Sequence, residues 1–101
     1  MAELIWSDRA LSDLEGIYDY IASGSHVYAS YTIQDLFDSS ERLKIFPDSG
    51  RHLPEFPELP YRELVLGNYR TIYRFDNDRD TVIIVTVVHG SRLIKESYLS
   101  E

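Results

Sequence analysis

All four prolines of this 101-residue chain lie between residues 47 and 60. Proline fixes φ and lacks a backbone N–H donor, so this segment cannot form a helix or a central strand. The sequence therefore predicts a loop of about fourteen residues. An ordered loop of that length in a small domain often carries function, although a plain crossover from helix to sheet is an equally good interpretation.

Before this loop, apolar residues recur at steps of three and four, which is typical of amphipathic helices. One helix is predicted over residues 8–22, with Ser7 as its N-cap, and a second over residues 27–46. The segment 23–25, Ser-Gly-Ser, ends the first helix. This short joint makes the two helices an antiparallel hairpin. A short strand is predicted over residues 3–6, ahead of the first helix.

After the loop, the pattern changes to that of strands. Residues 61–66 and 69–75 flank a Gly-Asn pair, which predicts a β-hairpin with a two-residue turn. Residues 81–88 are apolar on both faces, which predicts the central strand of the sheet. Residues 91–101 are interpreted as a polar tail. The order β-α-α-β-β-β predicts one α+β domain over residues 1–101, with the helical hairpin packed on one face of a small antiparallel sheet.

Composition excludes several classes of protein. The chain has no cysteine, which excludes disulfides, thiolate catalysis and thiolate metal sites. Its three histidines lack metal-ligand spacing, the alternating acids of residues 76–80 fit an acidic turn better than a calcium loop, and no nucleotide-binding motif is present. We therefore expect no metal and no cofactor. No apolar run is long enough to span a membrane, and we expect a cytoplasmic protein.

Charge is distributed unevenly along the chain, whose formal net charge is −7. Residues 1–50 carry three basic and nine acidic side chains, and residues 51–101 carry seven and eight. Any surface that binds anions should therefore lie in the second half. The candidate binding residues there are five arginines: Arg51, Arg62, Arg70, Arg74 and Arg92.

Two of these arginines share one face of a predicted strand. Arg70 and Arg74 alternate with aromatic residues over 69–75, and the aromatic face should meet the helices or neighbouring strands. We therefore expect the two arginines to line an open face of the sheet, with His89 at its border. Arginines beside a histidine and a tyrosine can bind phosphate and handle protons. The alternative, which composition favours, is that they form ion pairs with Glu63 and the other acids.

Five short motifs resemble the ParE/RelE superfamily of toxins from bacterial type II toxin–antitoxin systems. They occur in the family's order over nearly the whole chain: Trp6-Ser7-x-x-Ala10-x-x-Asp13-Leu14-x-x-Ile17-x-x-Tyr20-Ile21, Phe46-Pro47-x-x-Gly50-Arg51, Tyr61-Arg62-Glu63, Tyr69-Arg70-x-Ile72-Tyr73-Arg74 and Val85-x-x-Val88-His89-Gly90-x-Arg92. The fold that this resemblance implies, two helices on a small antiparallel sheet, agrees with the fold predicted from periodicity.

The resemblance implies one of two activities. ParE-like toxins inhibit DNA gyrase and do no chemistry of their own, whereas RelE-like toxins cleave mRNA in the ribosomal A site. By resemblance to the second group, Arg70, His89, Arg92 and Tyr98 would be the catalytic residues. The loop at 47–60 has no lysine, and the net charge is negative, which disfavours heavy phosphate contact. The ending at 85–92 is also more ParE-like, so a gyrase inhibitor is favoured, with an inactive homologue as a third hypothesis.

The resemblance also implies a cognate antitoxin, and hence a hetero-oligomer. By family analogy, a C-terminal segment of the antitoxin folds onto the toxin as a helix and an added strand, along the helices and the open sheet. Family antitoxins are mostly acidic and meet basic toxins. Because this chain is itself acidic, we expect either a more apolar interface or an antitoxin with basic binding residues.

Overall fold

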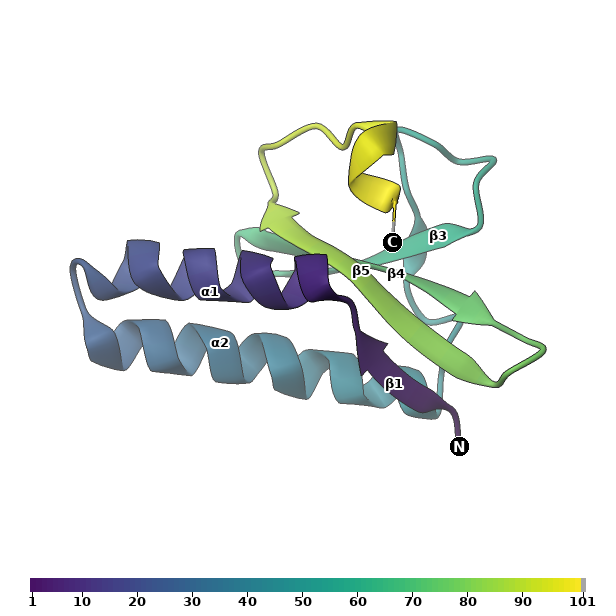
Figure 1. The fold of residues 1–101 in the computed structure, drawn as a ribbon, viewed down its shortest axis with the longest axis horizontal. Helices are drawn as coiled ribbons and strands as arrows, with labels where there is room; N and C mark the ends of the chain where they lie inside the picture. Colours follow the sequence, from purple (N-terminus) through teal and green to yellow (C-terminus); the bar gives the residue numbers. More distant parts are fainter. Residues whose placement is uncertain (101) are drawn as a thin grey trace.

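The computed structural model describes residues 1–100 and has the predicted α+β order. A five-stranded sheet carries the helical hairpin on one face, as Figure 1 shows. The elements in chain order are β1 (Glu3–Trp6), α1 (Asp8–Ala22), α2 (His26–Glu41), the 3₁₀ turn η1 (Arg42–Lys44), β2 (Arg51–His52), β3 (Tyr61–Leu66), β4 (Tyr69–Asp76), β5 (Thr81–His89) and the 3₁₀ turn η2 (Glu96–Leu99).

The sheet differs from the prediction in its pairing. Its strand order is β1-β5-β4-β3-β2, and β1 lies parallel to β5, so the sheet is mixed rather than wholly antiparallel. The chain leaves β1 through two helices instead of a tight turn, and nothing local then forces an antiparallel return. The predicted central strand, β5, is interior, but β4 occupies the middle position. The proline-rich loop also contributes β2, a two-residue strand at the sheet edge.

The first helix begins where the sequence predicts, and the second begins one residue earlier than predicted. The Ser7 side chain caps α1 by accepting from the Ala10 backbone N–H at 3.0 Å, and Ser25 caps α2 by accepting from Tyr28. The second helix ends earlier than predicted: α2 stops at Glu41, and η1 follows it. The chain tightens there into a 3₁₀ turn, as helix ends commonly do.

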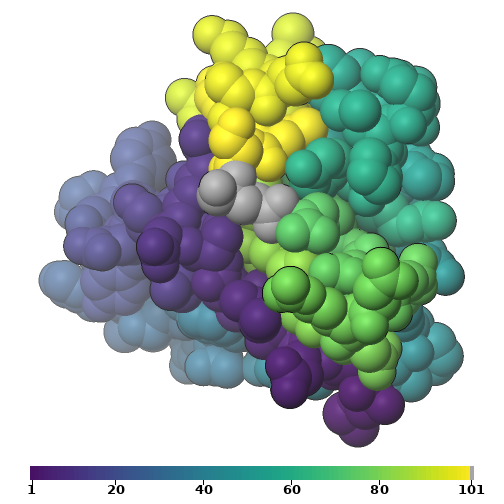
Figure 2. Space-filling view, turned by 45° about the vertical axis from the view of Figure 1, so that its right-hand side comes forward, coloured from purple at the N-terminus to yellow at the C-terminus, as the bar shows by residue number. Residues whose placement is uncertain are grey.

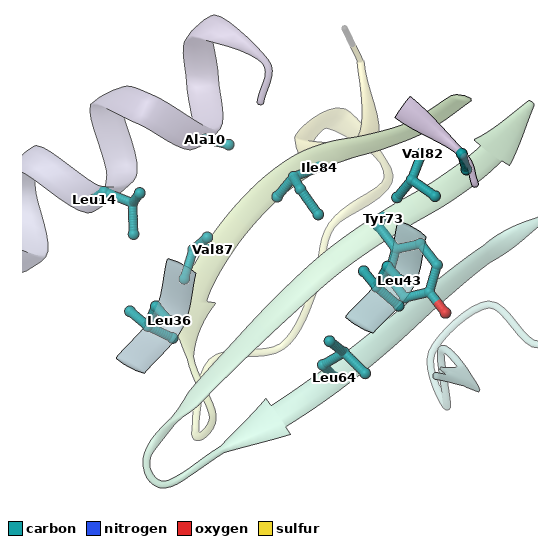
Figure 3. Packing of buried hydrophobic residues seen from close by; sticks show 10 residues of the cluster. Ala10, Leu14, Leu36, Leu43, Leu64, Tyr73, Val82, Ile84 and Val87 are labelled. Atoms are coloured by element: carbon teal, nitrogen blue, oxygen red, sulfur yellow. The ribbon is translucent and has the colours of Figure 1, made fainter. Parts of the chain in front are cut away.

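A large apolar core lies between the helices and the sheet (Figure 3). As expected, the aromatic face of β4 meets the helices, and Tyr73 is fully buried there. The buried members of this core are Ala2, Ala10, Leu14, Leu36, Leu43, Leu64, Tyr73, Val82, Ile84 and Val87. Burial of apolar area on this scale is the main source of stability in a domain of this size.

The opposite face of the sheet is covered, and the expectation of an open face is wrong. The proline-rich loop and the segment 91–99 pack over it, and Figure 2 shows the C-terminal residues in yellow beside the teal loop. The segment predicted as a polar tail buries Ile94 and Leu99 against Ile72 of β4. The apolar residues of this segment stand in two short pairs, Leu93-Ile94 and Tyr98-Leu99, which give no helix or strand period, so this second core was missed. Glu101, the end of the predicted tail, lies outside the described residues.

Helix α1 is joined to β5 by side chains of the first family-like motif. The register between β4 and β5 shifts after Ile72, which leaves Val85 as a bulge. The Ser7 hydroxyl donates to the Val85 carbonyl at 2.8 Å, and the Asp13 carboxylate accepts from the Val87 N–H at 3.0 Å and from the Thr86 hydroxyl. Ser7 and Asp13 therefore have a structural role in holding the helix on the bulged strand.

Within residues 1–100, no helix has both the length and the apolar character needed to cross a bilayer. The same range contains no cluster of three or more histidine, cysteine, aspartate or glutamate side chains arranged to hold a metal ion.

Candidate functional site

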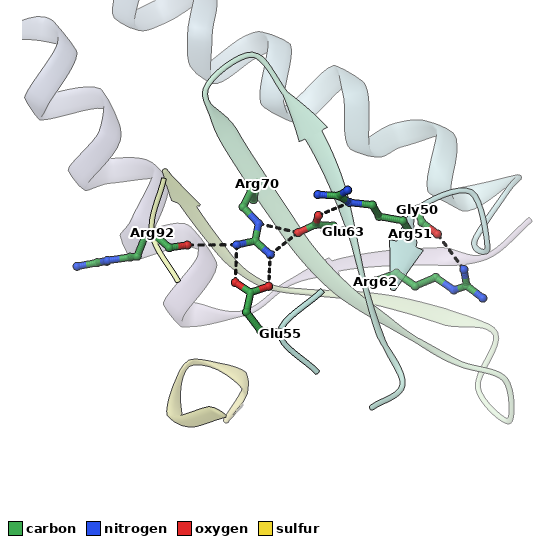
Figure 4. Close-up of polar contacts among 7 residues, drawn as sticks. All are labelled: Gly50, Arg51, Glu55, Arg62, Glu63, Arg70 and Arg92. Carbon is green, nitrogen blue, oxygen red and sulfur yellow. Dashed lines mark hydrogen bonds and ion pairs between the residues drawn. The ribbon is translucent and has the colours of Figure 1, made fainter. Parts of the chain in front are cut away.

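Arg70 lies at the centre of a buried charge network on the second face of the sheet (Figure 4). Its Nη1 and Nη2 atoms donate to the two carboxylate oxygens of Glu55, each at 2.7 Å, and its Nε donates to Glu63 at 2.6 Å. The Arg92 carbonyl accepts from Nη1 at 3.2 Å. All three guanidinium nitrogens are therefore engaged, and Arg70 is only 6% exposed.

The network ties three segments of the chain together. Glu55 comes from the proline-rich loop and also accepts the Ile94 backbone N–H at 2.9 Å, while Glu63 comes from β3. Hydrogen bonds from Arg70 lower the pKa of the Glu55 carboxyl to about 2. The same bonds raise the pKa of the Arg70 guanidinium. Both groups are charged at neutral pH, and Arg70 holds the loop and the C-terminal segment on the sheet.

Of the other strand and loop arginines, Arg51 reaches the charge network through Glu63. Arg51 is largely exposed and pairs with the buried Glu63 carboxylate at 2.5 Å. Arg62 points elsewhere, with its Nη1 donating to the Gly50 carbonyl at 2.8 Å. Arg74 is partly buried farther along β4 and interacts with other groups of the protein. The alternative of ion pairing, which composition favoured, therefore describes Arg51 and Arg70.

Gly50 explains the second family-like motif. The hydroxyl of Tyr73 receives the Gly50 N–H at 2.9 Å and donates to the Pro47 carbonyl at 2.7 Å. A Cβ at Gly50 would lie 2.6 Å from the Glu63 carbonyl oxygen and 2.7 Å from Tyr73. The position therefore requires glycine for close packing, and the motif fixes where the loop begins.

A second basic cluster lies near the C-terminal turn. The guanidinium carbon of Arg92 is 5.6 Å from the centre of the Tyr98 ring, and that of Arg9 is 4.7 Å from it. Figure 4 shows the Arg92 side chain pointing away from Arg70. Neither Arg9 nor Arg92 forms an ion pair with any residue between 1 and 100. The sequence analysis missed Arg9, because only the fold brings the first turn of α1 beside the C-terminal segment.

His89 and Arg92 line a cavity of about 650 Å³. The His89 ring packs edge-on against Tyr69 at 5.8 Å between ring centres. Its Nδ1 accepts the Ser91 backbone N–H at 3.1 Å, which leaves Nε2 to carry the proton of the neutral ring. We call this cavity the hairpin groove. Its lining residues are Ser12, Asp13, Gly16, Ile17, Tyr20, Ile21, Tyr28, Asn68, Tyr69, Val87, Val88, His89 and Arg92.

The four residues that the resemblance assigns to catalysis thus fall into two environments. Arg92 and Tyr98 lie together, and His89 shares the hairpin groove with Arg92. Arg70 is buried in the charge network, with its donors already bound to carboxylates. The exposed cluster can attract an anion, whereas Arg70 can reach one only if Glu55 moves away.

Comparison with known proteins gives a consistent result. Residues 4–94 match the family described as "ParE toxin of type II toxin-antitoxin system, parDE". The chain is 33% identical over 93 residues to "Toxin RelE2" of Caulobacter vibrioides, an alignment that covers 92% of this chain and 100% of that protein.

Solved structures of similar fold come from both branches. A chain of the chromosomal ParDE system of P. aeruginosa superposes with a TM-score of 0.72 and 25% identity, covering 88% of this chain and 96% of that one. The isolated E. coli RelE toxin superposes with a TM-score of 0.61 and 18% identity, covering 97% and 92%. A chain of the RelBE2 toxin–antitoxin complex of Mycobacterium tuberculosis superposes with a TM-score of 0.59 and 22% identity, covering 87% of this chain and 96% of that one.

Proposed function

The chain belongs to the ParE/RelE superfamily of toxins of type II toxin–antitoxin systems, and from this we propose that it is a ParE-like toxin that inhibits DNA gyrase by binding it. One observation carries the proposal: the guanidinium of Arg70 donates its hydrogen bonds to Glu55, Glu63 and the Arg92 carbonyl. A strand arginine held in this way has no donor left for a scissile phosphate. A toxin that acts by binding the surface of a partner protein does not need an arginine that is free to bind phosphate.

Purified chain should inhibit plasmid supercoiling by purified gyrase, and it should leave cell-free translation and the mRNA intact. The matched control is the same chain saturated with its antitoxin, which should restore supercoiling. Cleavage of mRNA on the ribosome, with supercoiling unaffected, would overturn the proposal in favour of the ribonuclease.

The ribonuclease alternative rests on the cluster of Arg9, Arg92 and Tyr98. Its two guanidiniums pair with no carboxylate among residues 1–100, and the exposed His89 lines the hairpin groove together with Arg92. Such a group can hold a phosphodiester and supply proton carriers to it. In that case Arg92→Ala should abolish mRNA cleavage, whereas Arg79→Ala, at the exposed β4–β5 turn, should not.

We propose further that a cognate antitoxin neutralises the chain in a hetero-oligomer. The similar structures support this, since those from P. aeruginosa and M. tuberculosis are described as toxin–antitoxin assemblies. Expression of the chain alone should arrest growth, and co-expression of the short neighbouring reading frame should restore growth and yield a co-purifying complex. Expression without growth arrest would instead support the inactive homologue.

A further inference from the structure

The helical hairpin is the part of the molecule that lacks basic side chains. Residues 10–41, which form most of α1 and all of α2, contain six acidic residues and neither lysine nor arginine. All ten lysines and arginines of the chain lie outside this stretch. Figure 1 shows both helices projecting past the ends of β3, β4 and β5. The projecting element therefore has a negative formal charge and stands apart from the arginines on the sheet.

One face of α2 is exposed to solvent over most of the helix. Tyr28, Tyr31, Asp35 and Asp38 follow one another at steps of three, four and three residues, so they lie on one side of the helix. Tyr28 is 63% exposed and Tyr31 is 66% exposed, and both aspartates are exposed as well. We call these four residues the α2 stripe. It is an unpartnered helix face that combines aromatic rings with carboxylates.

The fold does not account for the carboxylates of the α2 stripe. Neither of them forms an ion pair with a residue between 1 and 100. Asp38 accepts only from Gln34 of the same helix, at 2.9 Å. It lies in the last turn of α2, where a negative charge opposes the helix dipole. Glu41, in the same turn, differs because it pairs with Lys44. Negative charge on the stripe therefore costs the helix stability and points to a contact outside the chain.

The tyrosines of the α2 stripe border a depression that suits a basic side chain. The depression has a volume of about 170 Å³ and lies between α2 and the β3–β4 turn. Leu36 and Leu66 give it apolar lining, and Asp35 lines it too. Lysine and arginine have an apolar stem and a cationic head, which bind well beside tyrosine rings and a carboxylate. Exposed tyrosines are also typical anchors of protein–protein interfaces.

Charge decides which partner fits the α2 stripe. Nucleic acid is repelled, because the hairpin has a negative formal charge. A second copy of this chain would bring like carboxylates together, which opposes that contact. A cationic protein surface is attracted from a distance and satisfies both aspartates. Gyrase, the partner proposed above, must have such a surface, since an enzyme that holds DNA neutralises phosphates with lysine and arginine.

We propose that the α2 stripe binds the cationic surface with which gyrase holds DNA, so that the chain and DNA compete for the enzyme. This inference rests on the proposed function and names the surfaces that meet in it. The tyrosines supply the apolar contact, and Asp35 and Asp38 pair with basic side chains that otherwise contact phosphates. Occupancy of that surface is sufficient for inhibition, and no group on the sheet needs to do chemistry.

Charge reversal on the α2 stripe is the first test. Asp35→Lys combined with Asp38→Lys should weaken binding to purified gyrase, and inhibition of supercoiling, at least about 30-fold. The matched control, Glu58→Lys combined with Asp78→Lys, changes the net charge equally at exposed positions on other segments and should weaken both less than about threefold. A lysine in the last turn of α2 favours the helix dipole, so the first variant should remain folded by circular dichroism.

Shortening an aromatic side chain is the second test. Tyr31→Ala removes one exposed ring from the α2 stripe and should weaken binding to gyrase about tenfold. The matched control is Phe46→Ala, which removes a similarly exposed ring outside the stripe and should leave binding unchanged. Equal affinity of gyrase for the two variants would contradict a role for the stripe tyrosines.

Competition with DNA is the third test. A short linear duplex, added at about ten times its own dissociation constant for gyrase, should raise the apparent dissociation constant of the chain about tenfold. Binding that is insensitive to the duplex, or to charge reversal, would overturn this inference and leave the proposed function intact. Charge reversal that abolishes antitoxin binding but not inhibition would assign the α2 stripe to the antitoxin and also overturn it. A folded wild-type chain that does not inhibit supercoiling would overturn both.

Discussion

The two faces of the sheet are built on different physical principles. The face under the helices is an apolar core in which Ile84, Tyr73 and Leu36 are fully buried. The opposite face combines a smaller apolar cluster with a charge network around Arg70. The first face gains stability from area removed from water, largely regardless of pH. The second depends on the pairing of buried charges, so it should respond far more strongly to the loss of one partner and to acid.

Removing Arg70 should give the largest effect. Arg70→Ala leaves Glu63 with Arg51 alone and Glu55 without its bidentate partner, which should lower the free energy of unfolding by about 3–5 kcal/mol. Urea denaturation followed by circular dichroism measures this loss, with the exposed Arg79→Ala as control. Loss of toxicity in this variant would therefore reflect the fold, unless the protein is shown to remain folded.

The distinction between the two faces would be wrong if the charge network did not stabilise the fold. An Arg70→Met, Glu55→Gln, Glu63→Gln triple variant removes the charges together and should recover much of the stability lost by Arg70→Ala. If the single variant unfolds no more easily than wild type, the second face does not depend on paired charge.

Shortening a buried side chain under the helices should lower the free energy of unfolding slightly less than Arg70→Ala does. Ile84→Ala opens a cavity in a fully buried position and should lower the free energy of unfolding by about 3 kcal/mol, with little change between pH 4 and pH 7. Leu99→Ala, in the second cluster, should cost less, because the segment 91–99 can shift to fill the space. Equal costs at the two positions would mean that the second face is packed as rigidly as the first.

Local sequence patterns predict most of the secondary structure and the apolar face of the sheet that lies under the helices. The steps of three and four residues predicted α1, and the Gly-Asn turn predicted the hairpin of β3 and β4. The parallel pairing of β1 with β5 joins residues nearly eighty positions apart, and no local signal encodes it. The aromatic face of β4 was placed correctly against the helices because alternation fixes which side chains share a face.

The candidate site was less accessible to prediction. The sequence marked Arg70 and Glu63 as a potential ion pair, but nothing in it linked Arg70 to Glu55, which reaches the network from an irregular loop. The position of Arg9 and the hairpin groove depend on which segments the fold brings side by side. Arg92 was named from the charge distribution and again by resemblance, and Tyr98 by resemblance. The fold places their side chains together.

Acid should distinguish the two faces directly. The pKa of Glu55 is about 2 in the folded chain against 4.5 for the free side chain, so the unfolded state takes up protons first as the pH falls. The stability from this group is fully present above pH 4.5 and is lost between pH 4.5 and pH 2. At about 1.4 kcal/mol per pKa unit, the expected loss in the free energy of unfolding is about 3 kcal/mol.

Urea midpoints across this range measure the acid effect. Glu55→Gln should remove this part of the pH dependence, and Glu58→Gln, an exposed glutamate on the same loop, should retain it. A Glu55→Gln variant with the wild-type acid response would show that Glu55 is not the group that couples the second face to pH.

Removing Arg51, the most exposed residue of the charge network, should change the free energy of unfolding least. The Arg51 side chain is 65% exposed, whereas its partner Glu63 is fully buried and also paired with Arg70. Arg51→Ala therefore removes a solvent-screened contact and leaves the buried carboxylate with its inner partner, so it should cost about 0.5 kcal/mol. Measured by the same urea titration, a cost close to that of Arg70→Ala would mean that Glu63 is held from the solvent side. The segment 91–99 would then rest on the network without contributing to it, and the second face would resemble an ordinary surface ion pair rather than a buried one.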